Sequence, residues 1–261
     1  YIFLFIGDGM GYAQVAATEA YRAALENDSS PEALNFSEFP SQGIMTTHAG
    51  TRFITGSAAS GTALATGHKT SINTISMDPD RSVKYKTIAE KAKSHKMKVG
   101  IITSVSIDHA TPATFYAHEP LRHNYYSIGK QLTESNFDYF AGGGFKLPKG
   151  RSGDKPDLIE ITKSNGFEYV DSKKSFRKLD KNSGRVMAVN PRLDDGAMPY
   201  AMDMTRKDIT LADFTQKGIE LLDNDNGFFM MVEGGKIDWS AHGNDAAGVI
   251  HGVMAFADAV E

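Results

Sequence analysis

The chain has 261 residues, of which 41% are hydrophobic and 23% charged, an ordinary composition for a globular protein that is long enough to bury one large core. Its net charge of −4 gives no electrostatic reason to bind nucleic acid or an anionic membrane, and no apolar run approaches the roughly 20 residues that span a bilayer. Because cysteine is absent, disulfides and thiolate metal sites are excluded, and a metal could bind only oxygen and imidazole ligands.

Short apolar runs recur along the chain and are separated by segments with helical spacing. The runs are continuous and bounded by Gly, Asp or Asn, which is typical of parallel strands that are covered on both faces. Strands are expected at residues 2–6, 43–47, 99–104, 137–141, 185–189 and 228–232. Helices are expected from Tyr12, from Ser57 to a C-capping Gly67, from Thr87 to Ser94, from Leu211 to Leu221 and after His242.

This alternation favours an α/β fold with a doubly wound, mostly parallel sheet and helices on both faces. No repeat or linker interrupts it, so residues 1–261 are expected to form a single domain. Residues 146–156 are expected to form an exposed excursion, and residues 146–208 to serve as scaffold. Ligands of open parallel sheets bind at the carboxyl ends of the strands, and four segments with reactive side chains begin at such points.

The first two segments lie in the N-terminal quarter of the chain. In Gly7-Asp8-Gly9-Met10-Gly11 the glycines allow a sharp turn that brings the Asp8 carboxylate to the tip of the first strand, where it could bind a cation. Ser57 opens a helix rich in small residues, where free N–H groups and the helix dipole favour a phosphate. The alternatives are that Asp8 caps the following helix and that Ser57 is a structural N-cap.

The third and fourth segments follow later strands. His109 and Thr111 come after the strand at 99–104 and could face a metal and its waters, while the planar fork of Arg122 could bind two phosphate oxygens. Glu233 ends an apolar strand, where a carboxylate is costly to bury unless it is paired or binds a metal.

Asp238 and His242 complete the fourth segment. They are four positions apart, so they share one face of a helical turn and could chelate one ion. The alternative to phosphate binding is that Arg122 is an ordinary solvated side chain, and the alternative to metal binding is that His242 is a surface or core histidine.

With these four segments in this order, the chain resembles the alkaline phosphatase family over nearly its whole length. The stretches GDGMG, GSAASGTALATG, HATPA followed by Arg122, and VEGGKIDWSAH carry the resemblance. It implies a phosphate monoester hydrolase with two Zn²⁺ ions and one Mg²⁺ ion, which forms a homodimer in the periplasm or outside the cell. The expected partners are small phosphate monoesters and inorganic phosphate. The chain opens in a strand without an initiator Met, so processing before Tyr1 is expected.

The resemblance also implies roles for individual residues. Asp8 resembles the carboxylate that bridges a zinc and the magnesium, and Ser57 resembles the nucleophile, which ligates the same zinc. Thr111 and Glu233 resemble the remaining protein ligands of the magnesium. The implied reaction is an in-line attack by the Ser57 oxygen on phosphorus, followed by hydrolysis of the phosphoserine by water.

The remaining roles concern the phosphate and the second zinc. Arg122 resembles the arginine that grips the phosphate, and Asp238 and His242 resemble ligands of the other zinc. His109 and Trp239 occupy positions that vary in the family, where members that carry such residues tune the third metal site and phosphate release.

Two departures from the family pattern bear on these roles. Gly56 stands where many members have an Asp that helps to position the arginine, so Arg122 is expected to be held differently. The family also draws an Asp-His pair and a further His for its zinc ions from later segments, and none of the 28 residues after Glu233 matches them. We therefore expect a chain that is incomplete at its C-terminal end, with an exposed sheet edge, weak zinc binding, poor activity and a tendency to associate.

Other functions remain open at this point. Sulfatases, nucleotide pyrophosphatase/phosphodiesterases and cofactor-independent phosphoglycerate mutases share a metal-bound Asp near the first strand, but Ser57 lacks the Pro and Arg of a sulfatase motif. A non-catalytic phosphate- or metal-binding relative is favoured by Gly56 and the missing ligands, and opposed by the presence of Ser57, Arg122 and Glu233. The last alternative is an α/β scaffold of unrelated function.

Overall fold

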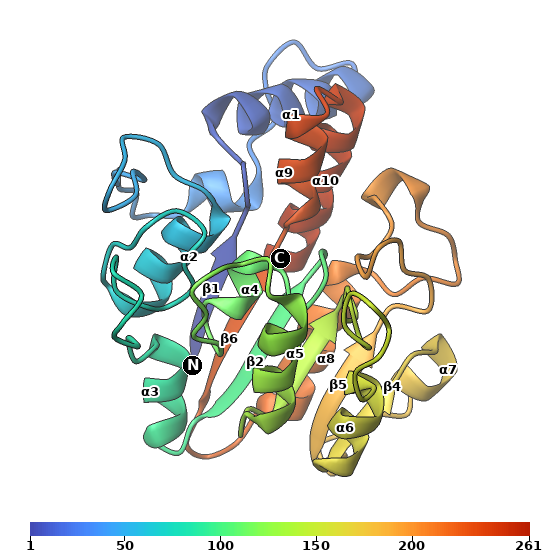
Figure 1. Cartoon of the computed structure of the whole chain (residues 1–261). Helices are drawn as coiled ribbons and strands as arrows, with labels where there is room; N and C mark the ends of the chain where they lie inside the picture. Colours follow the sequence, from blue (N-terminus) through green and yellow to red (C-terminus); the bar gives the residue numbers. More distant parts are fainter.

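A six-stranded, entirely parallel sheet forms the centre of the computed structural model, which describes all residues from Tyr1 to Glu261. The strand order is β1-β6-β2-β3-β5-β4 (Figure 1). The strands are β1 Ile2–Ile6, β2 Lys98–Thr103, β3 Tyr139–Gly142, β4 Phe167–Val170, β5 Arg185–Val189 and β6 Phe228–Glu233. The expected parallel α/β fold is confirmed.

Helices connect the strands, and several begin and end where local sequence signals place them. The α-helices are α1 Tyr12–Leu25, α2 Ser57–Thr66, α3 Ile88–Ser94, α4 Ala110–Ala113, α5 Tyr125–Glu134, α6 Leu158–Ser164, α7 Lys173–Phe176, α8 Leu211–Leu222, α9 Lys236–His242 and α10 Ala246–Val260, with 3-10 turns η1 Asn35–Glu38 and η2 Ala201–Asp203. A capping box formed by Thr87 and Glu90 starts α3, and Gly67 ends α2 with φ of 79°. None of these helices is both long and apolar enough to cross a membrane.

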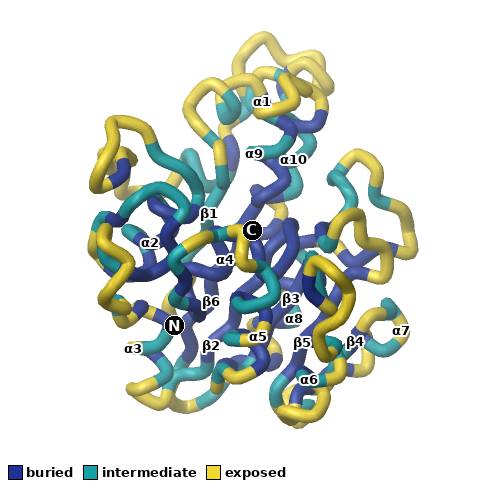
Figure 2. The backbone as a smooth tube through the Cα atoms, in the orientation of Figure 1, coloured by how far each residue is buried: buried dark blue, intermediate teal, exposed yellow.

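Each face of the sheet carries its own hydrophobic core, because successive side chains along a strand point in opposite directions. In β6, Met230 packs with α8 and α10 on one face, whereas Met231 packs with α2, α3 and α5 on the other. Figure 2 shows the buried backbone following the strands and the exposed backbone gathered in the outer loops. The helices on both faces leave the carboxyl ends of the strands as the place where loops converge.

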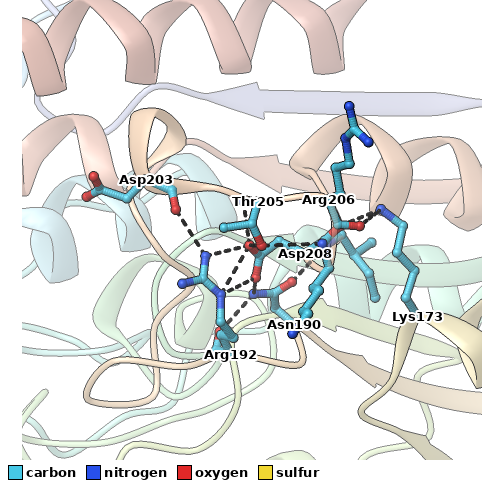
Figure 3. A network of polar contacts seen from close by, with 9 residues as sticks. Lys173, Asn190, Arg192, Asp203, Thr205, Arg206 and Asp208 are labelled. Carbon is cyan, nitrogen blue, oxygen red and sulfur yellow. Dashed lines mark hydrogen bonds and ion pairs between the residues drawn. The ribbon is translucent and has the colours of Figure 1, made fainter.

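The loop between β5 and α8 is fixed by a polar network around the buried Asp208 (Figure 3). The Asp208 carboxylate accepts hydrogen bonds from the Arg192 guanidinium, the Asn190 amide and both the N–H and hydroxyl of Thr205. Lys173 of α7 donates to the backbone carbonyls of Arg206 and Asp208. This part of the chain was expected to be scaffold, and the network gives it a defined shape.

Two of the expected strand assignments differ from the structure. The strand expected at 43–47 is wrong: the segment has no regular structure, and Ile44 is 94% exposed. An apolar run becomes a strand only beside a pairing partner, and none lies next to it. The strand β4 was missed, because its sequence Phe-Glu-Tyr-Val is short and lacks the continuous apolar character used to find the others. β1 and β4 form the two edges of the sheet, and Phe3 of β1 is 42% exposed.

Candidate active site

The first strand delivers Asp8 to the carboxyl edge of the sheet, against helix α9. The turn after β1 needs glycine at position 9, where φ is +67°. A Cβ there would lie 2.8 Å from the Asp238 Cα and 2.9 Å from the Asp238 Oδ1. Helix α1 is capped by Gly11 and not by Asp8, so the carboxylate is free for another role.

Ser57, at the start of α2, contacts Asp8 directly. Its Oγ donates a hydrogen bond of 2.8 Å to Asp8 Oδ2. Gly56 is the N-cap of α2 and Ser57 is the first residue of the helix, so the N-cap alternative for Ser57 does not apply. The Thr111 hydroxyl of α4 lies 3.5 Å from the same oxygen of Asp8. Three segments that are far apart in the sequence therefore meet at one carboxylate.

Glu233 lies beside this group, at the end of the central strand β6, and is fully buried. The Thr103 hydroxyl, which is in register on β2, donates to Glu233 Oε2, whereas Oε1 has no hydrogen-bond partner. A Cβ at Gly235 would lie 3.0 Å from the Glu233 carboxyl carbon, so glycine there leaves room for the carboxylate. Burial and the charge of Asp8 raise the pKa of Glu233 to about 8, and burial followed by the charge of Asp238 raises that of Asp8.

These oxygen atoms fit a hard cation. The carboxylates of the buried Glu233 and the half-buried Asp8 repel each other unless a positive charge lies between them, and the unpartnered Oε1 of Glu233 is a free ligand atom. The Thr111 and Ser57 hydroxyls complete a set of oxygen donors of the kind that Mg²⁺ prefers.

The zinc ligands implied by the resemblance are less completely assembled. Asp238 and His242 lie on one face of α9, with His242 Nε2 3.5 Å from Asp238 Oδ1, but the imidazole is 81% exposed. No three or more His, Asp or Glu side chains are gathered closely enough to hold a metal by themselves.

Arg122 approaches the site from the turn before α5 and is held by His109. Its Nη2 donates to His109 Nε2 at 2.9 Å. Burial and then the charge of Arg122 lower the pKa of His109 to about 3, so the ring is neutral and can accept this hydrogen bond. The Trp239 indole lies edge-on to His109, with ring centroids 5.8 Å apart. A Cβ at Gly56 would meet no atom within 4 Å, which leaves the space beside Ser57 open.

The structure thus brings together eight of the nine residues that the sequence singled out, and His242 joins them only through Asp238. Sequence reasoning missed Thr103, although it is the first polar residue after an apolar strand. It also missed Lys236, whose ammonium lies over the Trp239 ring. The sequence feature that could have revealed it is a single cation within the buried Gly-Gly-Lys-Ile stretch.

Comparison with known proteins places these features in a family. The sequence model of the family "Alkaline phosphatase" matches residues 1–261. Alkaline phosphatase 4 and alkaline phosphatase 3 of Bacillus subtilis align with 99% of the chain, and the aligned residues are 34% and 36% identical, respectively. The chain spans little more than half the length of these curated relatives, 56% and 55% respectively.

Solved structures agree with the sequence comparison. Alkaline phosphatase from the Antarctic bacterium TAB5 superposes with a TM-score of 0.84 at 34% identity, covering 99% of this chain and 72% of its own. The Thermus thermophilus enzyme gives a TM-score of 0.87 at 28% identity, covering 99% of this chain and 54% of its own. A variant of the TAB5 enzyme is described with Mg bound in its M3 site. By its sequence, its fold and the residues gathered at the edge of its sheet, the chain belongs to the alkaline phosphatase family.

Proposed function

We propose that the protein hydrolyses phosphate monoesters through a phosphoserine formed on Ser57. The observation that carries the proposal is the hydrogen bond of 2.8 Å between Ser57 Oγ and Asp8, at the strand edge where the unpartnered Glu233 oxygen also lies. A serine held in this way at a helix N-terminus faces free N–H groups and the positive end of the dipole, which favour a phosphoryl group.

Each residue has a defined part in this reaction. Ser57 Oγ attacks phosphorus and gives up its proton, and the ester oxygen leaves with a proton as the alcohol. Water then attacks phosphorus, breaks the bond to Oγ and releases inorganic phosphate, and one proton of the water returns to Oγ. Asp8 orients the hydroxyl by accepting its hydrogen bond. Arg122, steadied by the neutral His109, binds phosphoryl oxygens and compensates the charge that develops on them.

The donor set indicates where metals would bind. Asp8, Ser57, Thr111 and Glu233 would hold Mg²⁺ and the zinc next to the serine, and Asp238 with His242 would contribute to the other zinc. When bound, these ions lower the pKa of the serine hydroxyl and neutralise charge on the reacting oxygens. From the family we further infer small phosphate monoesters as substrates, a homodimer and a periplasmic or extracellular location.

Labelling with radioactive inorganic phosphate at mildly acid pH tests the nucleophile. Ser57→Ala should abolish the label while the far-UV spectrum stays unchanged. Ser60→Ala is the matched control, because Ser60 lies on the same helix and donates only to the Gly56 carbonyl. Label that persists in Ser57→Ala, or is lost in Ser60→Ala alone, would remove Ser57 from this role.

Two further measurements separate the alternatives. Arg122→Ala should weaken inhibition by inorganic phosphate, while Ala at the exposed Arg206 should not. A phosphodiesterase or a sulfatase would prefer a diester or a sulfate ester over a monoester with the same leaving group, and a non-catalytic relative would turn over none of the three.

A further inference from the structure

Lys236, the first residue of α9, is a buried cation without an anionic partner. Only 4% of the residue is exposed, and no carboxylate lies within ion-pair distance of its ammonium. Instead, Nζ lies 3.9 Å from the centroid of the Tyr200 ring and 4.4 Å from the centroid of the Trp239 ring. The aromatic faces stabilise the ammonium at close range, and the more distant carboxylates of Asp194, Asp195 and Asp203 add to this.

Both ends of this contact are anchored. The Lys236 N–H donates to Ser104 Oγ, directly after β2. Tyr200 belongs to the loop between β5 and α8 that the Asp208 network holds, through Arg192 on one side of it and Thr205 on the other (Figure 3). The ammonium therefore joins the scaffold loop to helix α9.

Trp239 carries this contact into the proposed phosphate site. Lys236 and Trp239 are three residues apart on α9, a spacing at which helical side chains touch. Beyond the indole, the ring of His109 lies edge-on at 5.8 Å, and His109 Nε2 accepts the hydrogen bond from Arg122. The half-buried indole is thus fixed by the ammonium on its face and by the imidazole near it.

We propose that Lys236, clamped between Tyr200 and Trp239, is a positioning residue that holds the Trp239 indole against His109 and so fixes the direction of Arg122. This inference rests on the proposed role of Arg122 in binding phosphate. Nothing in it requires Lys236 to touch the substrate.

The experiment uses inorganic phosphate as the probe and the full protein chain. Trp239 is the sole tryptophan, so its emission and its quenching by acrylamide report on the clamp directly. Lys236→Met keeps the length of the side chain but removes the charge; it should alter the emission and weaken phosphate binding about fivefold, as expected for loss of a desolvated cation–π contact. Lys236→Arg keeps a cation that stacks on aromatic rings and should stay within about twofold of the unsubstituted protein.

Two controls separate positioning from simple attraction between charges. Tyr200→Leu keeps the net charge but removes one wall of the clamp, and it should weaken phosphate binding and alter the emission in the same direction as Lys236→Met. Lys163→Met removes a cation 5.6 Å from the Tyr169 ring, on α6, and should change neither readout.

The outcomes are distinguishable. The clamp is overturned if Lys236→Met leaves either the emission or the phosphate affinity unchanged, if Tyr200→Leu leaves the affinity unchanged, or if Lys163→Met has an equal effect. If Arg122→Ala weakens phosphate binding and Lys236→Met does not, only the clamp fails. If Arg122→Ala itself leaves phosphate affinity unchanged, both the proposed role of Arg122 and the proposed role of Lys236 are wrong.

Discussion

Asp108 provides a sharp test of how the edge of the sheet is built. The side chain is fully buried in the loop between β2 and α4, directly before His109, and its oxygens accept the backbone N–H of Lys146. Burial raises its pKa to about 7, while the Ser106 hydroxyl and the Lys146 N–H offset only part of that effect. Asp108→Asn removes the ionisation and keeps a carbonyl acceptor for the Lys146 N–H.

The sign of the effect follows from proton binding. The pKa of Asp108 is higher in the folded chain than in the unfolded chain, so between about pH 4 and pH 7 the folded chain binds more protons and loses stability as pH rises. The shift from 3.8 to about 7 corresponds to at most about 4 kcal/mol, fully lost above the folded pKa. The Asn side chain does not ionise, so the variant does not lose this stability as pH rises. Its free energy of unfolding, relative to that of the unsubstituted protein, should therefore increase by about 3 kcal/mol between pH 5 and pH 9.

Urea unfolding of both proteins at pH 5, 7 and 9 measures the difference, in which the titration of all other groups cancels to first order. Asp108→Asn should be the more stable by about 1 kcal/mol at pH 5 and by about 4 kcal/mol at pH 9. A difference that is the same at all three pH values would refute the reasoning, because it would show that Asp108 ionises in the folded chain as readily as in the unfolded one.

Four other substitutions test the packing around the site. Gly235→Ala would place a Cβ 2.9 Å from Val105 and 3.0 Å from the Glu233 carboxyl carbon. Calorimetric titration should therefore show Mg²⁺ binding weakened by about tenfold or more. Unchanged binding would show that Glu233 is not a ligand. Above pH 8, where Glu233 is ionised, Glu233→Gln should raise the melting temperature of the metal-free chain, because it removes an unpaired buried charge, and it should abolish the stabilisation that added Mg²⁺ gives. Asp208→Ala should cost about 3–5 kcal/mol in urea unfolding, since it leaves buried donors unpaired. Gly56→Asp should change thermal stability by less than about 0.5 kcal/mol, because φ is −160° and the space is open; a loss of several degrees would contradict that.

Most of the fold could be read from local patterns. The strands β1 and β5 have the bounds that their apolar runs predicted, and the capping threonines of α3 and α8 mark the helix starts. These features depend on neighbouring residues in the chain, so sequence is sufficient to find them. The wrong strand at 43–47 and the missed β4 depend on whether a pairing strand lies beside them, which only the tertiary structure decides.

The site divides in the same way. The meeting of Asp8 and Glu233 follows from the rule that the carboxyl ends of parallel strands share one edge, so the sequence was sufficient to predict it. Ser57 opens helix α2, which follows no strand, so this rule does not account for its contact with Asp8. The partner of Arg122 could not, because His109 and Arg122 meet only through the packing of α4 against the turn before α5. Gly56 indicated that the arginine would be held differently but not which residue would hold it.

Unpaired buried charge marks the edge of the sheet where the function is proposed. Five Asp, Glu or Lys residues are buried: Asp108, Glu119, Asp208, Glu233 and Lys236. Two of these charges are compensated, Asp208 by an ion pair with Arg192, and Glu119 by hydrogen bonds from Asn124 and Ser127. The other three form no ion pair: Glu233 is the last residue of β6, and Asp108 and Lys236 come shortly after the neighbouring strands β2 and β6, whose carboxyl ends carry the site. A fold gains no stability from burying such charges, so their concentration at one edge is what a site built to hold phosphate and cations requires.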